Sequence, residues 1–173
     1  MKNIVLIGFM GTGKTTIATK VASELDMEYV SIDDIIVKRE KRTINEMFTK
    51  SGEDHFRDIE SSVVREVSAR DGLVIDTGGG VVLREENIEN LKSGGTVICL
   101  TAAPEVIYER TKKYKHRPLL NVEDPKLKIR ELMTRRQECY QKADHVIDTG
   151  ELTINQAIKK IIDIMKGQDV EKS

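Results

Sequence analysis

The residues from Gly8 to Thr15 read GFMGTGKT and match the phosphate-loop pattern G-x-x-x-x-G-K-[ST]. They follow the apolar run Ile4 to Ile7 and precede a segment, Thr16 to Leu25, whose apolar residues have helical spacing. Both flanking segments are what such a loop requires, so the pattern predicts a strand, loop and helix at the start of an α/β domain. The competing interpretation, a glycine-rich turn without a ligand, leaves the agreement of all these positions unexplained.

The residue types in this loop suit a nucleoside triphosphate. The glycines allow backbone N–H groups to turn inward around phosphate oxygens, and the N-terminus of the following helix adds partial positive charge. Lys14 can reach the β- and γ-phosphates, and the Thr15 hydroxyl can ligate Mg²⁺. We therefore expect the nucleotide to be bound by Gly11, Thr12, Gly13, Lys14, Thr15 and Thr16.

The composition favours one compact domain without a strong overall charge. The chain has 173 residues, and its 28 Lys and Arg nearly balance its 29 Asp and Glu. This balance predicts neither nucleic acid nor an anionic membrane as a partner. No apolar stretch reaches 18 residues and no signal peptide is recognisable, so we expect a cytoplasmic protein. Two cysteines far apart in the sequence indicate reduced thiols, not a zinc site or a disulfide.

Short β-rich runs alternate with helical segments along the chain. This alternation predicts a three-layer α/β/α phosphate-loop fold with a five-stranded parallel sheet. The carboxyl ends of parallel strands form one edge, where ligands bind, so the motifs that follow the strands should converge there. We expect one domain over residues 1–166, a frayed polar tail over 167–173, and a monomer. The predicted strands are residues 3–7, 29–32, 73–76, 96–100 and 145–147.

A kinase is the class of phosphate-loop protein that the remaining polar residues favour. The chain has no N-K-x-D tetrad for guanine recognition, which argues against a GTPase. Asp33 follows the second predicted strand, and the triple glycine Gly78, Gly79 and Gly80 follows the third. Such a triple glycine permits close backbone approach and presents N–H donors to a ligand, although a flexible turn is the alternative interpretation.

Two arginines are candidates for binding a carboxylate. Arg57 and Glu60 stand three residues apart in a helical segment and so share one side of it, while Arg136 lies in a later helical segment. An arginine can grip a carboxylate in a bidentate pair, which lysine does less specifically. Either arginine alone could also be a solvated surface charge. The polar stretch 112–124 contains Pro118 and predicts a mobile lid, with an ordinary surface loop as the alternative.

Taken together, these motifs resemble the shikimate kinase family in their order and spacing, over residues 1 to about 165. The residues that carry the resemblance are GFMGTGKT, Asp33, Phe56-Arg57-x-x-Glu60, Gly78-Gly79-Gly80, Arg117-Pro118-Leu119-Leu120 and Arg136. The resemblance implies a nucleoside-monophosphate-kinase-like fold with a substrate-binding helical segment at about 33–61. It also implies Mg²⁺-dependent transfer of the ATP γ-phosphate to the 3-hydroxyl of shikimate, in chorismate and aromatic amino acid biosynthesis.

The resemblance also implies roles for individual residues. Asp33 would contact the shikimate hydroxyls and act as the base for the attacking 3-hydroxyl. Arg57 and Arg136 would hold the carboxylate, with Glu60 orienting Arg57, and the glycines of the triplet would support the ring hydroxyls. In the nucleotide site, Arg117 would close over the transferring phosphoryl group beside Lys14. Arg110 would stack near adenine.

Two positions depart from the family pattern near the expected metal. The family usually carries Asp-x-Asp after the second strand, whereas this chain has Ser31-Ile32-Asp33. The position two before the triple glycine is usually Ser or Ala, whereas here it is Asp76. We hypothesise that the changes compensate, so that Thr15 and Asp76 hold Mg²⁺; the alternative is that Asp76 caps a turn or pairs with a base. Asp34 is expected to cap the next helix.

Two other functions stay open at the level of sequence. Another small-metabolite kinase, such as gluconate kinase, would share the phosphate loop and the fold, but it would not require F-R-x-x-E, the triple glycine and the distal arginine together. A nucleotide-binding module without catalysis would explain the departures at Ser31 and Asp76. The presence of Lys14, Thr15, Asp33 and Arg117 argues against that module.

Overall fold

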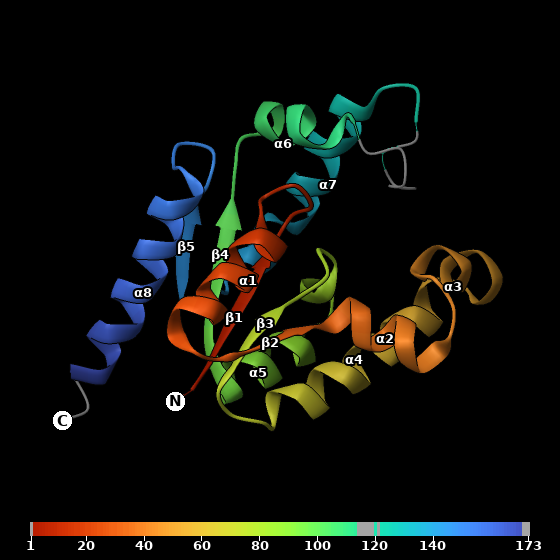
Figure 1. Ribbon diagram of the computed structural model, residues 1–173. Helices are drawn as coiled ribbons and strands as arrows, with labels where there is room; N and C mark the ends of the chain where they lie inside the picture. Colours follow the sequence, from red (N-terminus) through yellow and green to blue (C-terminus); the bar gives the residue numbers. More distant parts are fainter. Residues whose placement is uncertain (1, 114–119, 121, 171–173) are drawn as a thin grey trace.

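The computed structural model describes residues 2–113, 120 and 122–170 (Figure 1). Strands and helices alternate along the chain as the sequence predicts. The elements are β1 (Asn3–Gly8), α1 (Lys14–Leu25), β2 (Glu28–Ser31), α2 (Ile32–Glu40), α3 (Ile44–Ser51), α4 (Glu53–Ser68), β3 (Leu73–Asp76), the 3-10 helix η1 (Val81–Leu83), α5 (Glu85–Gly94), β4 (Gly95–Thr101), α6 (Pro104–Thr111), α7 (Pro125–Tyr140), β5 (His145–Asp148) and α8 (Ile154–Val170).

The five strands form one parallel sheet in the order β2-β3-β1-β4-β5, which confirms the predicted fold class. β1 lies in the middle and pairs with β3 on one side and β4 on the other. Because every pair is parallel, the segments that follow the strands all leave from one edge of the sheet. Since β2, β3 and β1 are adjacent, the residues that follow them lie near one another. These residues are Asp33, the triple glycine and the phosphate loop.

The start of α2 differs from the predicted boundary. The strand was expected to continue to Ile32, but it ends at Ser31, and Ile32 is the first helical residue. The Ser31 side chain accepts a hydrogen bond from the backbone N–H of Asp34 and so caps the helix. The expectation that Asp34 is the cap was wrong, because its N–H is the donor that needs capping. Asp33 consequently lies within the first helical turn.

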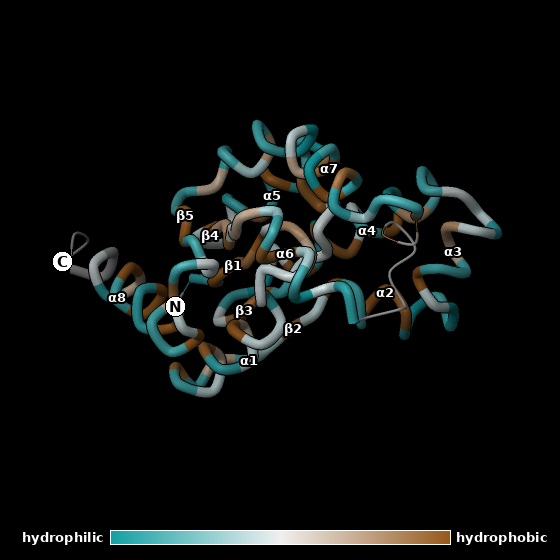
Figure 2. Tube along the Cα trace, turned by 90° about the horizontal axis from the view of Figure 1, so that it is seen from above, coloured by the Kyte–Doolittle hydropathy of each residue, from teal (hydrophilic) through white to brown (hydrophobic). Residues whose placement is uncertain are grey.

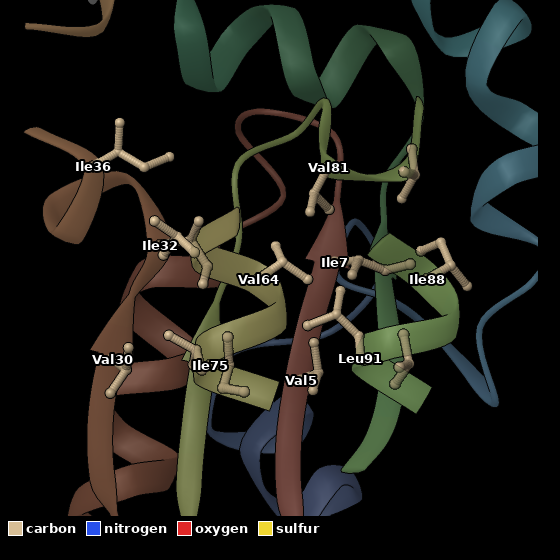
Figure 3. Packing of buried hydrophobic residues seen from close by; sticks show 14 of the residues in the cluster. Val5, Ile7, Val30, Ile32, Ile36, Val64, Ile75, Val81, Ile88 and Leu91 are labelled. Carbon is tan, nitrogen blue, oxygen red and sulfur yellow. The ribbon is translucent and has the colours of Figure 1, made fainter. Parts of the chain in front are cut away.

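One face of the sheet packs on α4, α5 and α2. Alternate side chains of the strands point to this side, since neighbouring residues of a strand face opposite ways. Figure 3 shows Val5 and Ile7 of β1 and Ile75 of β3 meeting Val64 of α4 and Leu91 of α5. Removing these side chains from water is the main driving force for placing the helices here.

The opposite face packs on α1 and α8. Ile4 and Leu6 of β1 are fully buried there, together with Ile17 of α1 and Ile161 of α8. In the view from above, hydrophobic segments gather between the layers while hydrophilic segments form the outside (Figure 2). The two covered faces make the three-layer α/β/α arrangement that the sequence predicts.

A third, smaller cluster supports the phosphate loop. Phe9 is 2% exposed and packs with Ile107 of α6 and with Ile129 and Leu132 of α7. Phe9, the residue that follows Gly8 in the phosphate loop, is thereby held in a separate hydrophobic cluster. This anchoring ties α6 and α7 to the loop that leaves β1.

The two ends of the domain differ in how they meet the predictions. α8 continues to Val170, so residues 167–170 of the expected frayed tail are helical, while 171–173 lie outside the described residues. The expected lid, 112–124, falls between the end of α6 and the start of α7, but much of it also lies outside the described residues.

Within the described part of the chain, no helix is long and apolar enough to cross a membrane. Both cysteines are free.

The packing of α5 on α4 predicts a strong effect of a small substitution. A methyl group on Gly94 would lie 2.2 Å from the backbone oxygen of Ser68, so Gly94→Ala forces two helix ends apart. We expect the free energy of unfolding to fall by about 1–3 kcal/mol, the usual range for an overpacked core. Gly167→Ala is the matched control, because no atom lies within 4 Å of a methyl group there. It should raise stability by up to about 1 kcal/mol, since alanine favours a helix over glycine.

Urea denaturation followed by circular dichroism measures both variants. Equal stability of Gly94→Ala and the wild-type chain would contradict the close contact between α4 and α5.

Candidate active site

A cleft of about 640 Å³ lies at the carboxyl ends of the strands. Its walls come from the segments after β1, β3 and β5, from the end of β2, and from α1, α2, α6 and α8. This position agrees with the general location of ligand sites in open α/β sheets. The lining residues include Met10 to Ile17, Tyr29, Ser31, Asp33, Asp34, Asp76 to Gly79, Arg110, Thr149 and Leu152 to Ile154.

The phosphate loop has the backbone conformation that only glycine adopts easily. Gly8 has φ +142°, and a methyl group on it would lie 2.2 Å from the backbone oxygen of Leu100 on β4. Gly13 has φ +95° and stands immediately before the first residue of α1. The loop is therefore a tight turn that aims the N-terminus of a 12-residue helix into the cleft. This arrangement is suited to binding phosphate.

Lys14 is the first residue of α1 and carries the positive charge of the loop. Its Nζ donates hydrogen bonds to the backbone oxygens of Gly8 at 2.8 Å and Phe9 at 3.2 Å. The side chain lies inside the loop and is only 9% exposed. The ammonium group is thus held where phosphate oxygens would enter, with weak carbonyl partners that a stronger anion can replace.

Asp76 ends β3 and faces the phosphate loop. Its Oδ2 accepts hydrogen bonds from the Thr15 hydroxyl at 2.6 Å and from the Tyr29 hydroxyl at 3.2 Å. Burial raises the pKa of Asp76, while the Thr15 hydrogen bond and the Lys14 charge oppose that rise. The structure therefore brings the two residues of the predicted metal site, Thr15 and Asp76, into direct contact.

A hydroxyl and a carboxylate suit Mg²⁺, which usually takes one or two protein oxygens and completes its shell with water and substrate phosphates. In residues 2–113, 120 and 122–170, no group of three or more His, Cys, Asp or Glu could hold a metal ion by itself. Any metal here therefore depends on ligands that the nucleotide and water provide.

Asp33 lies across the cleft from the loop, in the first turn of α2. Burial raises its pKa, and the nearby charge of Asp76 raises it further, while Lys14 acts in the opposite direction. Its Oδ1 and the Oε1 of Glu60 are both buried and lack a hydrogen-bond partner within the described chain. A methyl group on Gly78 would lie 2.9 Å from Asp33 Oδ1 and 3.3 Å from Glu60 Oε1, so the two oxygens converge beside this glycine. These two carboxylate oxygens can accept hydrogen bonds from the hydroxyl groups of a ligand.

Arg57 is held by two carboxylates of its own helix. Its NH1 donates to Glu60 Oε2 at 2.7 Å, and its Nε and NH2 donate to Glu53 Oε1 at 3.2 and 3.0 Å. Burial alone would lower the pKa of Arg57, but the charges of Glu60 and Glu53 outweigh burial and raise it. The guanidinium also lies 5.8 and 5.1 Å above the rings of Phe48 and Phe56.

The predicted pairing of Arg57 with Glu60 is therefore present. Glu53 was missed by the sequence analysis, although its position four residues before Arg57 was a usable signal.

Arg136 approaches the triple glycine from α7. Its NH1 donates to the backbone oxygen of Gly79 at 3.1 Å, and the Tyr140 hydroxyl donates to the same oxygen at 2.7 Å. Arg136 is 6% exposed and its guanidinium lies 5.8 Å above the ring of Phe9. Residues more than 50 positions apart in the chain are thereby joined at one turn. The role of Tyr140 could not be predicted from the sequence, because its partner is a backbone oxygen and every residue has one.

Gly80, the last residue of the triple glycine, packs directly against the guanidinium group of Arg57. A methyl group on Gly80 would lie 2.3 Å from Arg57 NH2 and 2.7 Å from NH1. The flexible-turn interpretation is therefore insufficient at Gly80, where the backbone packs directly against a guanidinium group. Arg57, Arg136 and the triple glycine form one cluster, the acceptor cluster, beside the part of the cleft that Gly78 and Gly79 line.

Arg110 lies at the other end of the cleft, where it joins two loops. Its NH1 donates to the Gly11 oxygen at 3.2 Å and to Thr149 Oγ1 at 3.1 Å, and its NH2 donates to the Thr149 oxygen at 2.7 Å. The stacking of Arg110 near adenine stays a prediction. Thr149, which also donates to the Thr12 oxygen at 2.8 Å, was missed because its role depends on the loop after β5.

The remaining predicted residues differ in what the structure describes. Gly11, Thr12, Gly13 and Thr16 line the cleft at the phosphate loop. Arg117 and most of the predicted lid around it lie outside the described residues. Parallel pairing brings the phosphate loop, Asp33, Asp76 and the triple glycine to one edge of the sheet, and α4, α6 and α7 bring Arg57, Arg110 and Arg136 to the same region.

The fold and the cleft together define a phosphate-loop enzyme of the small-molecule kinase type. Comparison with known proteins then gives a more specific result. Residues 10–166 match the family model described as shikimate kinase. The shikimate kinase of Thermodesulfovibrio yellowstonii is 49% identical over 162 residues, which cover 94% of each chain. That of Pelotomaculum thermopropionicum is 44% identical over 96% of each chain. This chain belongs to the shikimate kinase family.

Solved structures agree with this assignment. The shikimate kinase of Acinetobacter baumannii, solved in complex with shikimate, has a TM-score of 0.92 and 36% identity, over 97% of this chain and 94% of that chain. The Aquifex aeolicus shikimate kinase has a TM-score of 0.81 and 32% identity, over 97% of this chain and 98% of that chain. The predicted family, fold class and phosphotransferase activity are therefore confirmed.

The contact between Gly80 and Arg57 yields a direct test of the acceptor cluster. In Gly80→Ala the new methyl group must displace the guanidinium, which two carboxylates and two aromatic rings hold in place. We expect the KM for shikimate to rise about 10-fold or more, since a hydrogen bond to a charged group contributes about 1.5–3 kcal/mol.

ATP affinity should stay within a factor of about two, because the atoms nearest the new methyl group belong to Arg57 and not to the phosphate loop. Steady-state kinetics with each substrate varied in turn measures both quantities. An unchanged KM for shikimate would contradict a role of this contact in acceptor binding.

Proposed function

We propose that this chain transfers the γ-phosphoryl group of ATP to the 3-hydroxyl of shikimate, giving shikimate 3-phosphate and ADP. The observation that carries the proposal is a cleft lined by the phosphate loop, Asp33, Gly78 and Gly79, with Arg57 and Arg136 packed behind the glycines. The Acinetobacter baumannii relative was solved with shikimate, which supports the same acceptor here. The reaction belongs to chorismate and aromatic amino acid biosynthesis.

The chemistry needs alignment and charge stabilisation more than covalent help from the protein. The transferring phosphoryl group spreads negative charge over its outer oxygens, so fixed positive groups lower the barrier. The N–H groups at the start of α1 and the Lys14 ammonium act on the nucleotide side. Holding the acceptor hydroxyl in line with the phosphorus removes most of the entropic cost of bringing two substrates together.

Asp33 is the residue proposed to receive the proton of the 3-hydroxyl. Its buried Oδ1 is an acceptor without a partner in the described chain, so a ligand hydroxyl would satisfy it. Its raised pKa makes it a better base than an exposed aspartate. Arg57 and Arg136 would hold the shikimate carboxylate at the far side of the ring, and Gly78, Gly79 and Gly80 would contact the hydroxyl groups between them.

Arg117 and the segment 112–124 are proposed to close over the substrates, as the family resemblance implies. Arg117 would add positive charge at the transferring phosphoryl group. Closure would also exclude water, which competes with shikimate as the acceptor. Arg110 is proposed to stack near adenine, while its bonds to Gly11 and Thr149 join the base end of the cleft to the phosphate loop.

Mg²⁺ is proposed to be held by Thr15 directly and by Asp76 through water. When bound, the ion neutralises charge on the β- and γ-phosphates. The sheet register supports an exchange of positions, because Ser31 on β2 lies directly opposite Asp76 on β3. Neighbouring strands are about 4.8 Å apart, so an aspartate at either position would face the same small space. The carboxylate missing at Ser31 is thereby supplied one strand away.

An exchange experiment tests the metal proposal. Asp76→Asn keeps a hydrogen-bond acceptor for Thr15 and Tyr29 but removes the charge. We expect the Mg²⁺ concentration for half-maximal activity to rise about 10-fold or more, with little change in the KM for shikimate. Ser31→Asp in the same chain should restore most of the Mg²⁺ affinity. Mn²⁺ binding followed by electron paramagnetic resonance, with ATP present, gives a second readout. An unchanged metal titration in Asp76→Asn would overturn the proposal.

A coupled assay of ADP release tests the function itself. We expect ADP to form with shikimate and not with gluconate, and quinate should be a poor acceptor. Asp33→Asn should lower kcat by about 100-fold or more, in line with the usual contribution of general acid–base catalysis. ADP release that does not depend on shikimate, or no release at all, would contradict the proposed reaction.

Three further features of the protein are proposals. We place it in the cytoplasm and infer a monomer of one domain over residues 1–166. We also infer that ATP and shikimate, and not nucleic acid or a membrane, are its partners, since its acidic and basic residues are nearly balanced. Purification followed by a sizing column addresses the oligomeric state.

A further inference from the structure

Each nitrogen of the Arg57 guanidinium donates a hydrogen bond to a carboxylate of α4. Nε and NH2 form its side edge, and both donate to a single oxygen, Glu53 Oε1. NH1 donates to Glu60 Oε2. The backbone at Gly80 packs against NH1 and NH2, where even a methyl group would lie within 2.7 Å. An acceptor carboxylate that approaches the side edge of Arg57 must therefore compete with Glu53.

The two carboxylate partners are held very differently. The side chain of Glu60 is 1% exposed, whereas that of Glu53 is 54% exposed. Leaving a buried carboxylate without its cation is costly, because water cannot replace the lost interaction. An exposed carboxylate returns to water at little cost, since exposed ion pairs contribute little net stability. Glu53 is thus the partner that can leave, and Glu60 is the partner that stays.

Arg136 offers a useful contrast at the same end of the cleft. Its hydrogen bond goes to a backbone oxygen, that of Gly79. Within residues 2–113, 120 and 122–170, no carboxylate forms an ion pair with it. The cluster therefore has one arginine without a carboxylate partner and one arginine with two. This asymmetry has a consequence for the acceptor that the cluster selects.

We propose that Glu53 is a specificity-determining residue whose carboxylate occupies the side edge of Arg57 in the free enzyme and is displaced by the carboxylate of the acceptor. This inference rests on the proposed function. An acceptor carboxylate would supply the same negative charge in place of Glu53, and its two oxygens could accept from Nε and NH2 in parallel, where Glu53 offers one oxygen. An acceptor without that charge gains less from Arg57 than Glu53 does, so it leaves the internal pair intact. Selection against uncharged polyols then arises from competition within the protein.

The sign of the effect separates this role from a structural one. If Glu53 only positioned Arg57, its loss would weaken acceptor binding. If Glu53 competes with the acceptor, its loss strengthens binding. Glu53→Gln keeps the shape of the side chain and removes the charge. We expect the Kd for shikimate, measured by isothermal titration calorimetry in the presence of ADP and Mg²⁺, to fall about two- to fivefold.

Asp54→Asn is the matched control. Asp54 is also exposed in the first turn of α4 and carries the same charge, but its side chain forms no ion pair with Arg57. Its replacement should leave the Kd for shikimate unchanged. The methyl ester of shikimate, which lacks the negative charge, should bind equally weakly to the wild-type chain and to Glu53→Gln. Thermal melting of both variants verifies that α4 remains folded.

Each outcome bears on the inference. An unchanged or higher Kd in Glu53→Gln would overturn it, and so would an equal gain in Asp54→Asn, because a general loss of negative charge would then explain the effect. Turnover of shikimate by the wild-type chain tests the proposed function separately. Without that turnover and without shikimate binding, both proposals fall. With wild-type turnover and no gain in Glu53→Gln, only the role of Glu53 falls.

Discussion

The parallel pairing of β1 with both β3 and β4 is the constraint on which the cleft depends. Leu6 lies opposite Asp76 on one side, and Gly8 lies opposite Leu100 on the other. This register sets the phosphate loop beside the end of β3, where the Thr15 hydroxyl reaches the Asp76 carboxylate. A shift of one residue would turn Asp76 toward the other face of the sheet, because side chains alternate along a strand. The nucleotide end of the site is therefore fixed by the hydrophobic core that fixes the register.

The acceptor end is built by different means, since its charges come from helices and not from strand ends. Arg57 and Glu60 belong to α4, Arg136 belongs to α7, and they meet only at the triple glycine. Bringing such charges together under partial burial has a cost that each ion pair offsets only in part. The remaining unsatisfied oxygens of Asp33 and Glu60 mark where a ligand would complete the network. The phosphate-loop side of the site is thus fixed by strand pairing, whereas on the other side Asp33 Oδ1 and Glu60 Oε1 still lack hydrogen-bond partners in the described chain.

Sequence reasoning reached the sheet, its helices and the main motifs, because each of these is encoded by local patterns. The phosphate loop and the alternation of strands and helices are visible without any tertiary contact. Helix boundaries were less certain: Ser31 caps α2 where Asp34 was expected, and α8 continues past the predicted end at residue 166.

Apart from Glu53, the missed residues share one property, which is that their partners are distant or belong to the backbone. Tyr29, Tyr140 and Thr149 act through a carboxylate on another strand or through main-chain oxygens. Neither kind of partner leaves a mark in the sequence. Their importance is visible only after the sheet order has placed the loops next to one another.

The helix α7 connects the segment after α6 with the triple glycine. Asp124 caps its first turn, directly after the segment that joins it to α6, and Arg136 and Tyr140 hold the Gly79 oxygen near its last turn. Sixteen helical residues form a stiff rod of about 24 Å. A tilt of such a rod at its first turn displaces the side chains at its last turn, where Arg136 and Tyr140 contact Gly79. A change at the start of α7 would thus reach the triple glycine through the helix itself, without contact between the two regions.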